Sequence, residues 1–199
     1  LVLALKTLCG FGTDEIAFRL FTSEANVYKR LARARGRLRT VGRTELPTGD
    51  ALRARLPGVR SVLYLLFNEG YLSVRADRAI RAELCTEAIR LATLVAVHPV
   101  GEHDPTTAAL LALMHLHAAR LSSRTDHAGE LVLLEEQDRA AWDPAHLALG
   151  VRWLGKAQRA ETPSRFHLEA AIAAEHALAA SFTETDWPRI ARYYQQLAQ

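Results

Sequence analysis

Cysteine is scarce in this chain of 199 residues, and the two that occur, Cys9 and Cys85, lie far apart. Their spacing fits neither a metal knuckle nor a disulfide framework, so we expect two buried thiols in a protein of the reducing cytoplasm. Long apolar runs are also missing, since none reaches the roughly 18 residues that a membrane span requires. No signal peptide is visible, and we predict no contact with a membrane.

The sequence also lacks the motifs of several enzyme classes: a Gly-rich phosphate loop, a Gly-x-Ser-x-Gly elbow and a paired Cys-His nucleophile. His115 and His117 stand two residues apart and therefore point to different faces of a helix, unlike the i,i+4 pair of a zinc helix. We interpret them as packing or surface residues. The sequence therefore predicts no enzyme, no metal and no cofactor.

Acidic side chains crowd the segment 126–138, which leaves open a hydrolase that uses these acids. Their spacing defines no coordination geometry. We favour a structural interpretation, in which a buried Arg139 pairs with one of the acids and Trp142 packs beside it.

Sustained period-two alternation is absent, whereas apolar residues recur at helical spacing along almost the whole chain. This pattern predicts an all-α fold. A first helix should end near Leu8, where glycines follow. Consecutive antiparallel pairs suggest a tetratricopeptide-like array or α-solenoid, although no clean 34-residue repeat is visible. We expect further helices near residues 13–20, 24–39, 50–67, 77–97, 105–121, 143–160, 164–180 and 185–198.

The segment "TVGRTELPTGD", residues 40–50, mixes Gly, Pro and Thr without an apolar period and is the best candidate linker. We predict a first unit over residues 1–42, a linker over 43–50 and a helical extension over 51–199. Charge divides in the same way: residues 1–60 carry a net charge of +7 and the remainder −4. Because Leu1 opens the chain within an apolar pattern, we expect a piece of a longer protein.

The basic stretch "VYKRLARARGRLRTVGR", residues 27–43, contains seven Lys or Arg and no acid. A helical wheel places Val27, Leu31, Ala34 and Leu38 on one stripe and a basic face on the other side. Thr13 and Ser23 are candidate N-caps on either side of a short turn. A solvated basic helix is the simpler alternative, but the caps, the turn and the apolar stripe together favour a helix-turn-helix.

The stretch "TDEIAFRLFTSEANVYKRLARARGRLR" resembles region four of bacterial RNA polymerase sigma factors of the extracytoplasmic-function group. The match comprises an acidic pair with Ile-Ala, then Ser-Glu before Val27, then a run that ends Arg-Ala-Arg-x-x-Leu-Arg. The resemblance implies binding to promoter DNA and to core RNA polymerase. It makes Tyr28, Lys29, Ala32 and Arg33 the candidate base readers. Phosphate contacts are expected from Asn26, Arg30, Arg35, Arg37, Arg39 and Arg43.

The rest of the chain, including "LYLLFNEGYLS" and "GELVLLEEQDRAAWD", resembles the tetratricopeptide-like C-terminal extension of a sigma-factor subgroup. That resemblance implies a module that interacts with the polymerase or with a regulatory protein. Within "FNEGY" we expect a helix C-terminal turn, with Asn68 and Gly70 in left-handed geometry and Phe67 and Tyr71 packed inward.

A sigma-factor piece is thus the leading hypothesis. A helical protein-interaction scaffold, or a helix-turn-helix regulator without sigma activity, is the alternative. Because the extension is acidic, it is open whether it covers the basic helix; we expect Lys29 and Arg33 to be at least partly exposed.

Overall fold

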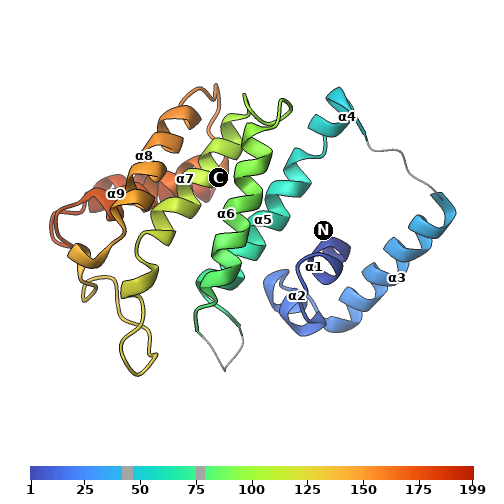
Figure 1. The fold of residues 1–199 in the computed structure, drawn as a ribbon, viewed down its shortest axis with the longest axis horizontal. Helices are drawn as coiled ribbons and strands as arrows, with labels where there is room; N and C mark the ends of the chain where they lie inside the picture. The colour runs from blue at the N-terminus through green and yellow to red at the C-terminus, as the bar shows by residue number, and fades with distance from the viewer. Residues whose placement is uncertain (42–46, 75–78) are drawn as a thin grey trace.

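The computed structural model describes residues 1–41, 47–74 and 79–199, and these ranges contain helices and no β-strand (Figure 1). The predicted all-α class is confirmed. None of the helices in the described ranges has the length and apolar character needed to cross a membrane. The α-helices are α1 (Val2–Thr7), α2 (Thr13–Arg19), α3 (Glu24–Val41), α4 (Gly49–Arg53), α5 (Leu56–Tyr71), α6 (Ala82–Val97), α7 (Pro105–Ala118), α8 (Pro144–Ala157), α9 (Arg165–Leu178) and α10 (Trp187–Leu197), with short 3-10 helices η1 (Leu121–Ser123) and η2 (Arg139–Ala141).

Helices α1, α2 and α3 pack against one another at the N-terminal end of the chain. Their shared core consists of large apolar side chains that are almost completely removed from water. Burial of this kind stabilises a helix by roughly 1.5–3 kcal/mol for each large apolar side chain. These core residues include Leu5, Phe11, Ile16, Val27 and Leu31.

The ends of α2 and α3 are defined by local hydrogen bonds. Ser23 caps α3 as predicted, because its hydroxyl accepts the Asn26 N–H at 3.3 Å. The prediction of Thr13 as the cap of α2 is wrong: Gly12 precedes the helix, and its N–H donates to the carboxylate of Glu15. A carboxylate three residues into the helix performs the capping there, which leaves the Thr13 hydroxyl free for α3.

Helix α7 is the centre of the larger part of the molecule. It packs against α6, α8 and α9 and also touches α5 (Figure 1). Because neighbours surround it, α7 is apolar on nearly all sides, and the side chains from Thr107 to Leu116 are buried. His115 lies in this core with its Nδ1 2.9 Å from Nδ1 of His146, and the ring of His117 lies 4.7 Å from that of Tyr71. Both histidines are packing residues, as expected.

The segment "FNEGY" does not form the expected turn. It is the last part of α5, and neither Asn68 nor Gly70 has a positive φ. Gly70 is required for a different reason, since a Cβ there would lie 2.7 Å from the backbone N of Cys85 and 2.8 Å from the carbonyl of Arg81. The glycine therefore allows α5 and α6 to approach closely. Phe67 is buried as predicted.

Cys85 is buried as expected, and burial raises the pKa of its thiol to about 12. Cys9 is only partly buried, because α1 ends just before it at the edge of the N-terminal core. Arg139 also departs from expectation. Among the described residues it pairs with no acid, and instead its guanidinium donates to the carbonyls of His176 and Ala179.

The predicted packing of Trp142 beside Arg139 is confirmed, with the Arg139 guanidinium carbon 4.7 Å from the ring centroid. The acids of the segment 126–138 are exposed. Among the described residues, no three His, Cys, Asp or Glu side chains form a group suited to a metal ion. The predicted domain boundary falls in the linker over residues 43–50, of which 43–46 lie outside the described ranges, so that boundary stays a prediction.

Candidate nucleic-acid interface

Helix α3 lies at one end of the molecule, where it packs on α1 and α2 and extends away from α5–α10 (Figure 1). The turn before it contains Phe21, whose φ of 48° is left-handed and whose side chain is 97% exposed. This conformation costs a non-glycine residue roughly 1–2 kcal/mol. The turn between α2 and α3 is short, and the two helices pack against each other.

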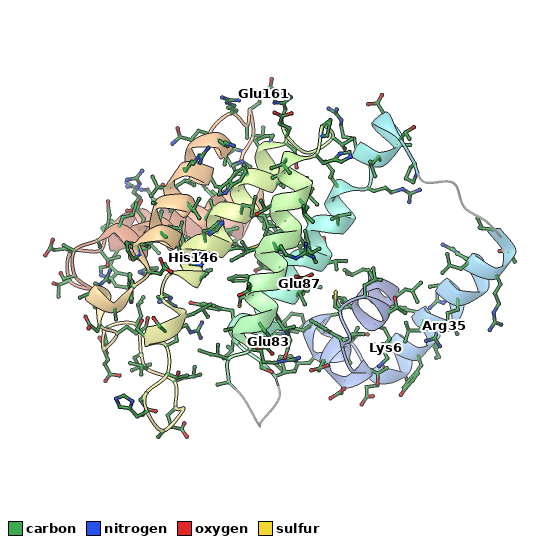
Figure 2. The ribbon with its side chains drawn as sticks, viewed as in Figure 1. Lys6, Arg35, Glu83, Glu87, His146 and Glu161 are labelled. Atoms are coloured by element: carbon green, nitrogen blue, oxygen red, sulfur yellow. The ribbon has the colours of Figure 1, made fainter. Side chains whose placement is uncertain are left out.

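The seven candidate DNA-binding residues on α3 are all exposed to solvent. The four charged members, Lys29, Arg30, Arg33 and Arg37, form no ion pair with a carboxylate of the described residues. The same is true of Arg35 and Arg39, and Arg35 is labelled on α3 in Figure 2. Arg43 lies outside the described residues. The candidates are Asn26, Tyr28, Lys29, Arg30, Ala32, Arg33 and Arg37.

The apolar stripe on the other side of α3 is only half as long as the helical wheel predicts. Val27 and Leu31 are buried, Ala34 is partly buried, and Leu38 is 55% exposed. Helices α1 and α2 are short, so the last turns of α3 extend past them and find no apolar surface to cover Leu38. The basic segment is thus anchored by its first two turns.

Tyr28 is held by a small polar contact with the start of α2. The hydroxyl of Thr13 lies 2.9 Å from a carboxylate oxygen of Glu24 and 3.3 Å from the hydroxyl of Tyr28. The Asn26 amide donates to the hydroxyl of Thr22 at 3.3 Å. These contacts restrict two candidate residues at the N-terminal end of α3. Arg33 makes a long hydrogen bond within its own helix, from Nε to the carbonyl of Lys29 at 3.4 Å, and its side chain and that of Lys29 are exposed.

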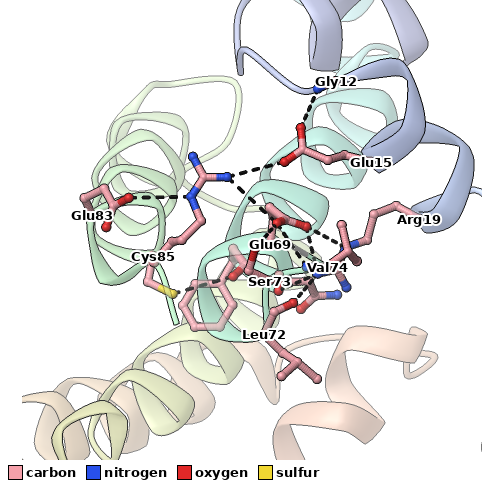
Figure 3. A network of polar contacts seen from close by, with 12 residues as sticks. Gly12, Glu15, Arg19, Glu69, Leu72, Ser73, Val74, Glu83 and Cys85 are labelled. Carbon is pink, nitrogen blue, oxygen red and sulfur yellow. Dashed lines mark hydrogen bonds and ion pairs between the residues drawn. The ribbon is translucent and has the colours of Figure 1, made fainter. Parts of the chain in front are cut away.

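A buried polar network, formed by Glu15, Arg19, Glu69 and Arg81, joins the N-terminal helices to the larger part of the molecule (Figure 3). Its centre is Glu69 on α5, which is completely buried. Arg19 of α2 donates to Oε2 of Glu69 from Nε at 3.0 Å and from Nη2 at 2.9 Å.

The other Glu69 oxygen completes the network. Oε1 accepts the hydroxyl of Ser73 at 2.6 Å and the N–H of Val74 at 3.3 Å. Nη1 of Arg81 lies 3.8 Å from the same oxygen and 3.6 Å from Oε1 of Glu15. Arg19 further donates to the carbonyls of Asn68 and Leu72. The polar network therefore attaches α2, and not α3, to the extension, which leaves the basic face uncovered.

Sequence reasoning did not find Glu69 as the centre of this network. The available signal was a lone acid within an apolar helical stretch, "LYLLFNEGY", because an acid there is rarely buried without a cationic partner. The partner, Arg19, is 50 residues away in the chain. Only the tertiary structure, in which Arg19 of α2 reaches Glu69 of α5, identifies it.

Comparison with known proteins gives two matches. The model of a family of unknown function, DUF6596, matches residues 55–158. An uncharacterized protein of Rhizobium meliloti (strain 1021) is 38% identical over 200 residues, which cover 99% of this chain and 46% of that protein. The chain thus spans less than half of the length of this relative. No solved structure matches the chain.

Proposed function

The chain belongs to the family of unknown function DUF6596, and we propose that it is the promoter-binding and regulatory part of an RNA polymerase sigma factor that acts in the cytoplasm. In this proposal α2 and α3 form region four, α3 enters the major groove of the upstream promoter element, and the same unit docks on core RNA polymerase. Helices α5–α10 form a tetratricopeptide-like extension that interacts with the polymerase or a regulatory protein. The activity is binding, and no bond is made or broken.

The single observation that carries the proposal is the exposed and unneutralised basic face of α3. Lys29, Arg30 and Arg33 are exposed and form no ion pair with a described residue. Like charges on a surface without counter-charges repel one another. Binding to the phosphates of a nucleic acid relieves this repulsion and releases the counterions of the phosphates, and both effects favour binding. Lys and Arg can also take both acceptors of guanine in the major groove.

The small residues of α3 fit the same role. Ala32 and Gly36 are exposed between the long cationic side chains. Because they project little from the helix, the backbone can come close to the floor of a groove while the neighbouring arginines reach phosphates. Backbone contacts from Arg30, Arg35, Arg37 and Arg39 would supply affinity, and Tyr28, Lys29 and Arg33 would supply base readout.

Fluorescence anisotropy with labelled promoter duplexes tests the proposal. The apparent affinity should fall with salt with a log–log slope of about −4, as expected when four or five phosphates are neutralised. Arg33→Ala should weaken binding by roughly 5- to 100-fold, the range of a base-contacting arginine. The matched control is Arg152→Ala, which removes an exposed arginine of α8 and should leave the affinity unchanged. A flat salt response, or equal affinities of the two variants, would refute DNA binding by α3.

A helical protein-interaction scaffold is the second candidate, and an apolar groove between α1, α5 and α6 favours it. The groove has a volume of about 450 Å³ and is lined by Leu8, Val62, Leu91 and other apolar side chains. Leu8 is 82% exposed and therefore extends the apolar surface beyond the groove, and contiguous apolar surface marks interaction sites. In this case α3 would dock on an acidic protein surface, and DNA binding would be absent at physiological salt.

A further inference from the structure

A second group of cations lies in the extension, at the C-terminal end of α7. Arg120 follows α7, Arg124 follows η1, and Arg139 opens η2. The backbone brings these segments together, because the Asp143 N–H donates to the carbonyl of Ala119 at 2.8 Å. We call Arg120, Arg124, Arg139 and the neighbouring His117 and His176 the α7-end cluster.

One half of the α7-end cluster is built around Tyr71. Nε of Arg120 donates to the Tyr71 hydroxyl at 2.7 Å. The guanidinium carbon of Arg124 lies 3.6 Å from the centroid of the same ring, and Arg124 is only 8% exposed. Nη1 of Arg124 is buried and has no hydrogen-bond partner among the described residues. Burial of an unpaired guanidinium N–H costs free energy, so this side chain needs a further acceptor.

The other half lies against the end of α9. Arg139 donates from Nη1 to the carbonyls of His176 at 2.6 Å and Ala179 at 2.9 Å, which satisfies the last turn of that helix. This capping explains Nη1 alone. Nη2 of Arg139, Nδ1 of His176 and Nε1 of the buried Trp142 are enclosed and make no hydrogen bond within the part of the chain that the structure describes. Four polar nitrogen atoms of one region are therefore unsatisfied.

No carboxylate among the described residues forms an ion pair with Arg120, Arg124 or Arg139, although ion pairs are common elsewhere in these ranges. The cations of the α7-end cluster affect the pKa values of their neighbours. Burial, and after it the charge of Arg120, lowers the pKa of Arg139 and of His176. Burial also lowers the pKa of Arg124, where Tyr71 acts in the opposite direction and Arg120 adds to the lowering. A half-buried group of three permanent cations without a counter-charge is electrostatically unfavourable. An anion from solution would remove this penalty.

We propose that the α7-end cluster is a binding site for a phosphate group, either the free ion or that of a small phosphomonoester. The single negative charge of a carboxylate would neutralise only one of the three guanidiniums. Phosphate at neutral pH carries nearly two negative charges and three strong acceptor oxygens, and therefore matches them better. Arg120, Arg139 and His176 are each partly exposed, so the ion has a route from solvent. Long arginine side chains can turn their unpaired N–H groups toward it. The site is independent of the proposed function of α3.

Thermal unfolding and titration calorimetry with inorganic phosphate test the proposal, without DNA and at constant ionic strength set with chloride. The chain should bind one phosphate saturably, and at a hundred times the dissociation constant its melting temperature should rise by roughly 5–10 °C. Arg120→Gln should lose this rise, whereas Arg152→Gln, which removes an exposed arginine of α8, should keep it. Comparing the two variants separates binding from the general stabilisation of proteins by phosphate salts.

If Arg120→Gln does not fold, titration calorimetry of Arg139→Gln with inorganic phosphate tests the proposal instead. This variant also removes a cation of the α7-end cluster and should weaken phosphate binding at least tenfold. Tighter binding of glycerol 3-phosphate than of inorganic phosphate identifies a phosphomonoester as the ligand, and the reverse order identifies the free ion. Absence of saturable binding, or equal melting shifts in Arg120→Gln and Arg152→Gln, would overturn the proposal. Arg33→Ala should bind phosphate normally, so a failure of this site is distinguishable from a failure of DNA binding.

Discussion

Replacement of Glu69 by glutamine is the sharpest test of how α2 is attached to α5. Glu69 is completely buried, and its two oxygens accept from Arg19, Ser73 and Val74. Glutamine has the same size and shape but only one acceptor oxygen. Its amide NH2 must therefore face either the guanidinium of Arg19 or the N–H of Val74, and one set of donors is left unpaired.

The expected cost follows from burial. Removing one partner of a buried ion pair typically costs about 3–5 kcal/mol, because the remaining charge stays buried without compensation. Arg19 keeps the carbonyls of Asn68 and Leu72 as acceptors, and its side chain is 15% exposed. We therefore expect Glu69→Gln to lower the free energy of unfolding by about 2–4 kcal/mol, which corresponds to a fall of roughly 5–15 °C in melting temperature.

Urea unfolding followed by circular dichroism measures this cost. The matched control is Glu83→Gln, which removes the 62% exposed partner of Arg81 and should change stability by less than about 0.5 kcal/mol. A double-mutant cycle with Arg19→Met should give a coupling energy of about 1–3 kcal/mol between the two sites. If Glu69→Gln were no more destabilising than Glu83→Gln, or if the coupling were zero, the buried network would not join α2 to α5 in solution.

Two further predictions concern packing and pH. Gly70→Ala should destabilise the chain by about 1–3 kcal/mol, because its Cβ would lie 2.7 Å from the backbone N of Cys85. The control Gly58→Ala lies on the same helix with open space around it and should be neutral or stabilising. Equal melting temperatures of the two variants would contradict the close approach of α5 and α6. Burial, with Arg120 and Arg124 nearby, lowers the pKa of His117 to about 3. Between pH 6.5 and 5 the His117 imidazole therefore takes up a proton in the unfolded chain but not in the folded chain. The free energy of unfolding should fall by about 1–2 kcal/mol over this range. His117→Phe should reduce this loss in urea titrations at the two pH values, and an unchanged pH dependence would mean that His117 is protonated in the folded chain.

The helices were predictable because their signals are local. The caps, apolar periods and breaks placed α7, α8, α9 and α10 within a few residues of their observed bounds. Errors occurred where a local pattern has two physical solutions. Asn68 and Gly70 suit a left-handed turn, but they also suit a helix that must approach another helix closely, and only the position of Cys85 decides between them.

The basic face of α3 was likewise evident from helical spacing, and the exposure expected for Lys29 and Arg33 is observed. The wheel could not show how far the apolar stripe would be covered. Leu38 has the right phase to be buried but lies beyond the ends of α1 and α2, so it stays exposed. The side of a helix on which a residue lies follows from its spacing in the sequence. Whether a neighbouring helix extends far enough to cover that residue depends on tertiary packing.

The sequence by itself determined that this chain is helical, that a basic helix follows a capped turn, and which side of that helix bears the charge. Each of these properties depends on residues three or four positions apart, whose spacing a helix converts directly into a face. Tertiary structure alone decided that Glu69 meets Arg19, and that Arg120, Arg124 and Arg139 lie near one another while no carboxylate of the described residues pairs with them. Such groupings join residues far apart in the chain, and no local period records them, because they arise only when separate helices pack.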